Sequence, residues 1–166
     1  HNARRGVVII METHTGHIKA LANYPEDYNM AVADHFEPGS TFKIASVMAA
    51  LEDGVVNRET LIETGDRGEW RLYEDNVMRD DRSHGEITLQ EAVEQSSNIA
   101  IAKVIYERYR NQPQRFLDRL AQIGALSNSE FQLRGEPQPY VIRPGTPHWS
   151  GITLPWLSTG YNVKLT

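Results

Sequence analysis

Glu37-Pro38-Gly39-Ser40-Thr41-Phe42-Lys43 is the stretch that decides how this 166-residue sequence is interpreted. Its Pro-Gly pair closes a polar, irregular segment, residues 26–38, and a helical pattern of apolar residues follows. The pattern stops at Asp53-Gly54, and its apolar members are Phe42, Ala45, Val47, Met48 and Leu51. The sequence therefore predicts a helix of about three to four turns that begins at Ser40.

Ser40 and Lys43 are three residues apart, which places both side chains on one face of the predicted helix. A serine hydroxyl is a weak nucleophile until a base takes its proton, and a lysine can be that base once burial favours its neutral form. Free N–H groups at the helix start can stabilise negative charge on a bound carbonyl oxygen. Alone, the pair is weak evidence, because about 0.2 such pairs are expected by chance and helix-capping serines are common.

Ser96-Ser97-Asn98 is the second candidate, and it lies between two predicted helices. Thr88-Leu89-Gln90-Glu91 forms a capping box that opens the first helix. The second helix follows Asn98, with one apolar face made of Ile99, Ala102, Ile105 and Tyr106. At such a junction the hydroxyl of Ser96 can relay a proton and the amide of Asn98 can hold substrate or a lysine. The alternative is that the segment only caps the second helix.

The other segments predict an α+β fold, with a largely helical part beside the first strands of an antiparallel sheet. Gly6–Met11 and residues 17–23 predict an N-terminal hairpin. Residues 57–86 predict short strands or turns around Trp70-Arg71-Leu72-Tyr73. A third helix is predicted over residues 114–123, between Pro113 and Gly124. The last forty residues contain five prolines and are predicted as loops with short extended pieces.

Composition excludes several classes of function. The chain has no cysteine, which excludes disulfides, thiolate metal sites and cysteine nucleophiles. Its net charge of −5 disfavours a nucleic-acid partner, which usually needs a basic face. No apolar run is long enough to span a membrane, and the first residues lack the apolar stretch of a signal peptide. The mixed charges of Arg79-Asp80-Asp81-Arg82 are typical of a solvated loop.

Two further groups of residues are given structural rather than functional interpretations. His14 and His17 fall in a predicted turn without a nearby third ligand, which favours solvent-facing side chains over a metal site. Trp70, Trp149 and Trp156 are expected to pack rather than to bind sugar. No cofactor or metal is therefore predicted.

In combination, these motifs resemble the transpeptidase domain of class B penicillin-binding proteins. That family carries Ser-x-x-Lys, Ser-Asp-Asn and Lys-Thr-Gly in order. This chain has the first two about fifty-five residues apart, as in the family, with Ser97 replacing the middle Asp. Glu37 before Pro-Gly-Ser favours the division-type branch. Three more stretches resemble the family: Thr15-Gly16-His17-Ile18-Lys19-Ala20-Leu21-Ala22-Asn23-Tyr24-Pro25, Ile87-Thr88-Leu89-Gln90-Glu91-Ala92-Val93 and Leu157-Ser158-Thr159-Gly160-Tyr161-Asn162-Val163.

The resemblance implies that residues 1–166 are a partial transpeptidase domain of an enzyme that cross-links peptidoglycan. Ser40 would attack the penultimate D-alanine of a stem peptide, with its own N–H as half of an oxyanion hole. Lys43 would be the general base, Ser96 and Asn98 would move protons and bind the substrate amide, and Ser97 would face elsewhere. An amine of a second stem peptide would take the acyl group. β-Lactams such as penicillin would acylate the same serine.

The implied partners are stem peptides ending in D-Ala-D-Ala and β-lactam antibiotics. A periplasmic location, a membrane anchor outside this chain and a cell-wall synthesis complex are implied by the family alone. The sequence departs from the family in lacking Lys-Thr-Gly, for which Lys164-Leu165-Thr166 is no match. We therefore expect missing C-terminal strands, an incomplete active site and an exposed sheet edge.

Two other functions remain open. A class A-like β-lactamase would need a deacylating glutamate, for which Glu130 and Glu136 are conceivable. A non-catalytic β-lactam sensor or scaffold would keep the acylation residues but would not transfer the acyl group to an amine.

Overall fold

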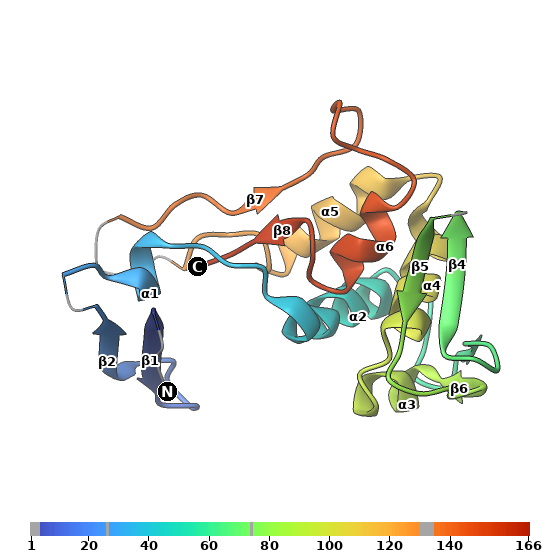
Figure 1. Cartoon of the computed structure of the whole chain (residues 1–166), viewed down its shortest axis with the longest axis horizontal. Coiled ribbons are helices and arrows are strands. Elements are labelled where there is room, and N and C mark those ends of the chain that lie inside the picture. The colour runs from blue at the N-terminus through green and yellow to red at the C-terminus, as the bar shows by residue number, and fades with distance from the viewer. Residues whose placement is uncertain (1–3, 26, 74, 130–134) are drawn as a thin grey trace.

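Strands β1 (Gly6–Met11) and β2 (Ile18–Tyr24) form the predicted N-terminal hairpin. They pair antiparallel from Gly6 opposite Tyr24 to Ile10 opposite Ala20, as the β-branched run in β1 favours. The computed structural model describes residues 4–25, 27–73, 75–129 and 135–166, and in it the hairpin stands apart from the main helical bundle (Figure 1). All six residues of β1 are exposed, so the hairpin contributes little to the main core.

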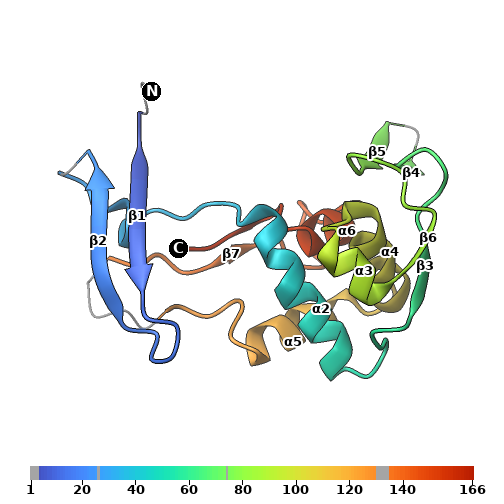
Figure 2. The same cartoon turned by 90° about the horizontal axis from the view of Figure 1, so that it is seen from below.

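The helices of the main bundle gather at the other end of the molecule (Figure 2). They are α2 (Phe42–Glu52), α3 (Leu89–Glu94), α4 (Asn98–Tyr109), α5 (Pro113–Gln122) and α6 (Thr153–Ser158). Helix α4 contacts each of the other four, which explains why Ile99, Ile101 and Ile105 are fully buried. The apolar face predicted for α4 is confirmed, and burial of such side chains is the main contribution to the stability of this part.

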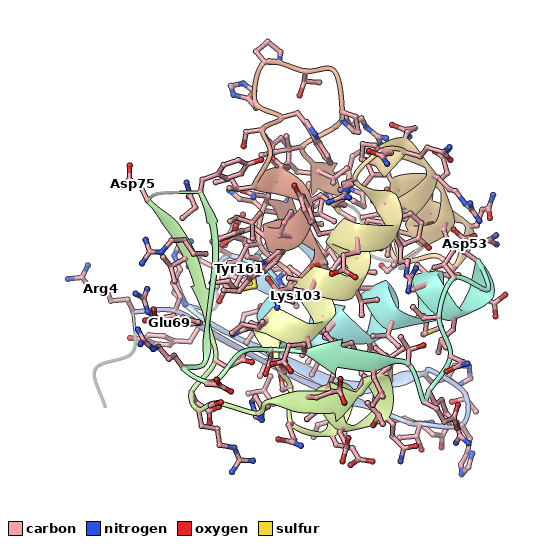
Figure 3. All side chains as sticks on the ribbon, turned by 90° about the vertical axis from the view of Figure 1, so that its right-hand side faces the viewer. Arg4, Asp53, Glu69, Asp75, Lys103 and Tyr161 are labelled. Atoms are coloured by element: carbon pink, nitrogen blue, oxygen red, sulfur yellow. The ribbon has the colours of Figure 1, made fainter. Side chains whose placement is uncertain are left out.

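A buried carboxylate fastens one end of this bundle. The Asp53 side chain, 2% exposed, accepts hydrogen bonds from Tyr109 Oη at 2.9 Å and Arg119 Nε at 2.8 Å, and pairs with Arg115 at 3.0 Å. Burial pushes the pKa of Asp53 upward, but the bonds from Arg119 and Tyr109 hold it below its ordinary value. Asp53 thereby joins the end of α2 to α4 and α5, as its place in Figure 3 shows.

Three small antiparallel sheets complete the structure. Strand β3 (Leu61–Glu63) pairs with β6 (Glu86–Thr88), β4 (Glu69–Tyr73) with β5 (Asn76–Arg79), and β7 (Tyr140–Val141) with β8 (Val163–Lys164). The β4–β5 hairpin lies against α4 and α6, where Trp70 and Trp156 pack on Met78, Ile99 and Ala102. Short strands around Trp70 were predicted. The pairing of β3 with β6, which joins the two ends of this region, was not predicted.

The α+β prediction is confirmed, and so is the capping box: the Thr88 and Glu91 side chains each accept from the other's backbone N–H. For the last forty residues, the predicted short extended pieces are present as β7 and β8, but the prediction missed α6. Pro155 sits in the first turn of α6, where a missing N–H removes no intrahelical hydrogen bond. A short helix, α1 (Met30–Ala33), also interrupts the segment predicted to be irregular. None of the helices in the described ranges is long and apolar enough to cross a membrane.

Candidate active site

Ser40 lies in the single 3-10 turn η1 (Gly39–Thr41), which runs directly into α2. The Thr41 hydroxyl donates to the Pro38 carbonyl at 2.7 Å and closes this turn. Gly39 has φ +56°, a left-handed conformation that glycine adopts without strain. The Ser40 side chain is exposed, and within the described part of the chain its hydroxyl has no hydrogen-bond partner. It is therefore free to meet an incoming group.

Lys43, one turn further along α2, is only 3% exposed. Its ammonium donates to the Ser96 carbonyl at 2.5 Å and to the Ser96 hydroxyl at 3.1 Å. Burial lowers the pKa of Lys43 from the ordinary lysine value of 10.5, while the negative charge of Asp80 opposes this by raising it. A lower pKa increases the fraction of neutral amine near neutral pH, which is the form that can accept a proton.

The backbone around Ser96 explains why its carbonyl meets this lysine. Ser96 has φ +53°, unusual for a residue with a side chain. Its N–H donates to the Val93 carbonyl and the N–H of Ser97 donates to the Ala92 carbonyl. These two bonds and the left-handed residue are the Schellman ending of a helix, where glycine is the usual choice. A serine in this position stores strain, a feature that concentrates at functional sites.

The other two residues of the motif point elsewhere. Ser97 is buried and caps α4, accepting from the N–H of Ala100 at 3.0 Å. The side-chain amide of Asn98 donates to the Arg79 carbonyl at 2.8 Å, and no hydrogen bond joins it to Lys43 in the part of the chain described here. The structure thus brings Ser96, but not Asn98, into contact with Lys43. The roles assigned to all four residues stay predictions.

The interpretation of the charge cluster at residues 79–82 as a solvated loop was wrong for Asp80. The Asp80 side chain is 2% exposed and accepts hydrogen bonds from Ser97 Oγ at 2.5 Å and Asn98 N–H at 2.6 Å. Burial of a carboxylate is tolerated here because these donors replace its lost hydration.

The segment after α6 supports the turn that holds Ser40. The N–H of Gly39 donates to the Gly160 carbonyl at 3.2 Å, and the Glu37 carboxylate accepts from the Asn162 N–H at 3.0 Å. A pair of backbone hydrogen bonds between Phe36 and Leu165 extends this contact. Sequence reasoning recognised this segment only as a stretch that resembles the family, because a contact over more than a hundred residues leaves no local pattern.

The backbone of Gly160 approaches the backbone of Gly39 closely, which leaves no room for a side chain at position 160. Gly160 has φ +88°, and an added Cβ would overlap the Gly39 carbonyl oxygen. We expect Gly160→Ala to lose about 1–2 kcal/mol from an L residue at positive φ and about 1–3 kcal/mol more from overpacking. Urea unfolding of the natural polypeptide that contains these residues measures the loss.

Gly145→Ala is the matched control. Gly145 has φ +81° and nothing within 4 Å of an added Cβ, so only the first of the two losses applies. Equal losses in unfolding free energy for the two variants would show that the methyl group added at Gly160 does not collide with Gly39 in the turn before Ser40.

Other residues considered from the sequence lie outside this arrangement. The Glu136 carboxylate accepts from the Ser129 N–H at 2.7 Å and lines a cavity beside the N-terminal hairpin, and Glu130 lies outside the described residues. His14 and His17 are exposed in the β1–β2 turn. Over the described ranges, no three His, Asp or Glu side chains are placed to hold a metal ion.

Comparison with known proteins points to one family. The family model described as penicillin binding protein transpeptidase domain matches residues 6–166. Among curated proteins, the chain is 26% identical over 179 residues to the peptidoglycan D,D-transpeptidase FtsI of Escherichia coli strain K12. That alignment covers 100% of this chain and 29% of the relative, so the chain spans less than a third of its relative's length.

Two solved structures resemble this chain in fold as well as in sequence. The transpeptidase domain of Burkholderia pseudomallei penicillin-binding protein 3 matches with a TM-score of 0.78 and 28% identity, over 98% of this chain and 46% of that one. A Burkholderia ambifaria protein described as a peptidoglycan glycosyltransferase matches with a TM-score of 0.79 and 29% identity, over 99% of this chain and 50% of that one.

Proposed function

The chain belongs to the penicillin-binding protein transpeptidase domain family, and from this premise we propose that it carries the nucleophile and the base of a peptidoglycan D,D-transpeptidase. Residues 1–166 are on this proposal part of one transpeptidase domain. The observation that carries it is the pairing of an exposed Ser40 with a buried Lys43 whose ammonium is held by Ser96.

In the proposed first half-reaction, Ser40 Oγ attacks the carbonyl of the penultimate D-alanine of a stem peptide. A bond forms between Oγ and the carbonyl carbon, and neutral Lys43 takes the hydroxyl proton, directly or through the Ser96 hydroxyl. The Ser40 N–H, at the helix start, donates to the developing oxyanion. When the peptide C–N bond breaks, the proton passes to the amine of the departing D-alanine, so Lys43 is neutral again.

In the second half-reaction, an amine of a neighbouring stem peptide attacks the ester carbonyl. Lys43 accepts the proton of that amine, the C–Oγ bond breaks, and the proton returns to Ser40. A β-lactam enters the first half-reaction in the same way, because its strained amide is opened by Ser40. The Asn98 amide donates one N–H to the Arg79 carbonyl, which leaves its second N–H and its oxygen for other partners. With these two groups it can hold the substrate amide.

The proposal is tested by a donor–acceptor assay on the natural polypeptide that contains this chain. The donor is a stem peptide ending in D-Ala-D-Ala, and the acceptor is an amine-bearing stem peptide. We expect release of D-alanine together with a cross-linked product, and a long-lived adduct when benzylpenicillin replaces the donor.

Two results would contradict it. Rapid turnover of benzylpenicillin without cross-linking would indicate a β-lactamase. A stable adduct with no transfer to the acceptor, even at high acceptor concentration, would indicate a sensor.

The cellular setting follows from the same proposal. Stem peptides are cross-linked outside the cytoplasmic membrane, so we place the site at the periplasmic or outer face of that membrane, within the machinery that builds the cell wall.

A further inference from the structure

Asp80 occupies an unusual position for a residue from a cluster of mixed charges. It follows β5, and its carboxylate is inserted at the N-terminal end of α4. There it accepts from Ser97 Oγ at 2.5 Å, from the Asn98 N–H at 2.6 Å and from the Ile99 N–H at 3.2 Å. A negative charge accepting bonds from free N–H groups at a helix start is strongly held.

These three hydrogen bonds hold Ser97, Asn98 and Ile99, the residues that directly follow Ser96. Ser96 has left-handed backbone geometry, which is the less stable choice for a serine. The Schellman bonds hold it from the side of α3, and Asp80 holds the chain from the side of α4. The carbonyl and hydroxyl of Ser96, both bonded to Lys43 Nζ, are therefore fixed between two anchored helix ends.

Resting on the proposed function, we propose that Asp80 is a positioning residue for the general base. It holds the Ser96–Asn98 turn in the geometry that orients Lys43, and its charge acts on the protonation of that lysine. Asp80 does not touch substrate in this proposal; it acts through Ser96 and Lys43.

The other charged groups around Asp80 determine whether a residue besides Asp80 could act on the protonation of Lys43. His84, also 2% exposed, places Nε2 3.7 Å from Asp80 Oδ2, and that nitrogen lacks a hydrogen-bond partner among the described residues. Lys43, on α2, is a cation whose pKa the negative charge of Asp80 raises, against the larger lowering by burial. The neighbouring charges are directed elsewhere: Arg79 pairs with Glu69, Arg82 bonds to Gln95, and Asp81 is exposed.

The test compares Asp80→Asn with Asp81→Asn in the natural polypeptide that contains these residues. Both remove one negative charge from adjacent positions, but only the first removes it from the buried site. The measurement is the rate of acylation by benzylpenicillin as a function of pH. In the plot of this rate against pH, the low-pH limb is the part in which the rate rises as Lys43 loses its proton.

For Asp80→Asn we expect the plateau rate to fall by about tenfold or more, since bonds to a charged acceptor are replaced by weaker ones. We also expect the low-pH limb to move to lower pH. The sign follows because a lost carboxylate no longer favours the charged form of lysine. Asp81→Asn should keep both the rate and the limb of the unmodified protein.

A slower rate without movement of the limb would reduce Asp80 to a helix cap and overturn the electrostatic part. An unchanged rate and limb would overturn the proposal completely. Ser97→Ala supplies a second variant in case Asp80→Asn does not fold. It removes the Ser97 Oγ bond to Asp80 together with the bond that Ser97 Oγ accepts from the Ala100 N–H, and it keeps the charge of Asp80. The plateau should therefore fall severalfold while the limb stays in place; an unchanged plateau would contradict the positioning role.

A failure of the proposed function is recognised separately. If the unmodified protein forms no adduct, Ser40 acylation is wrong, yet the influence of Asp80 on Lys43 is still tested by NMR titration of Lys43 in protein labelled at lysine Cε. The Lys43 midpoint should be lower in Asp80→Asn than in Asp81→Asn. Equal midpoints would overturn the influence of Asp80 on this lysine.

Discussion

Replacement of Lys43 by glutamine is expected to slow acylation of Ser40 by benzylpenicillin by about 10²–10⁴-fold, the usual contribution of a positioned general base. Glutamine keeps side-chain N–H donors but has no amine that can accept a proton, so the expected loss is that of the base. The residual rate should lose the low-pH limb that Lys43 gives the unmodified protein. In that protein the limb should lie below pH 10.5, because burial lowers the pKa of Lys43.

The chain supplies a matched control for this variant. Lys103, on α4, also donates to a backbone carbonyl, that of Glu63 at 2.6 Å, and Figure 3 shows it on the outer side of the bundle. Lys103→Gln makes the same change in a lysine that donates to a backbone carbonyl outside the site, and this variant should acylate at the unmodified rate. Stopped-flow acylation of the three proteins across the pH range measures the effect. An equal loss in both variants, or an unchanged limb in Lys43→Gln, would rule out Lys43 as the base.

The parts of this site that sequence predicts are those encoded within a few residues. The capping box at Thr88 and Glu91 is one example, because both partners lie in one helical turn. The same-face relation of Ser40 and Lys43 is another, since it requires only a helix that begins at the serine. The hairpin and α4 were predicted from periodicity, which reports local conformation and burial together.

The contacts that sequence could not predict join residues far apart in the chain. Asp80 and Asn98 are held together by the β4–β5 hairpin folding over α4, and a run of four charged residues gives no sign of it. Gly39 and Gly160 meet for a similar reason. On α2 the apolar pattern also overstated burial, because Met48 and Leu51 are 46% and 39% exposed. Periodicity reports that a face is apolar but not which neighbour covers it.

The largest effect is expected from Ser40→Ala, which should abolish the adduct with benzylpenicillin. The Ser40 hydroxyl is exposed and has no hydrogen-bond partner within the described ranges. Its removal should therefore change the free energy of unfolding by no more than about 0.5 kcal/mol. Loss of the adduct in a protein of unchanged stability would then report chemistry rather than folding.

Intact mass after incubation with benzylpenicillin, followed by peptide mapping, measures this result. Ser83→Ala is the control, because that serine is also exposed and its hydroxyl donates to the Gly65 carbonyl at 2.9 Å, away from Lys43. Its adduct should form normally and map to the peptide that contains Ser40. An adduct that persists in Ser40→Ala would place the nucleophile elsewhere and would contradict the role proposed for Ser40. An adduct lost only in Ser40→Ala would instead tie acylation to the one hydroxyl that the turn at Gly39 presents one helical turn before a buried lysine, which is the geometry that a serine–lysine mechanism requires.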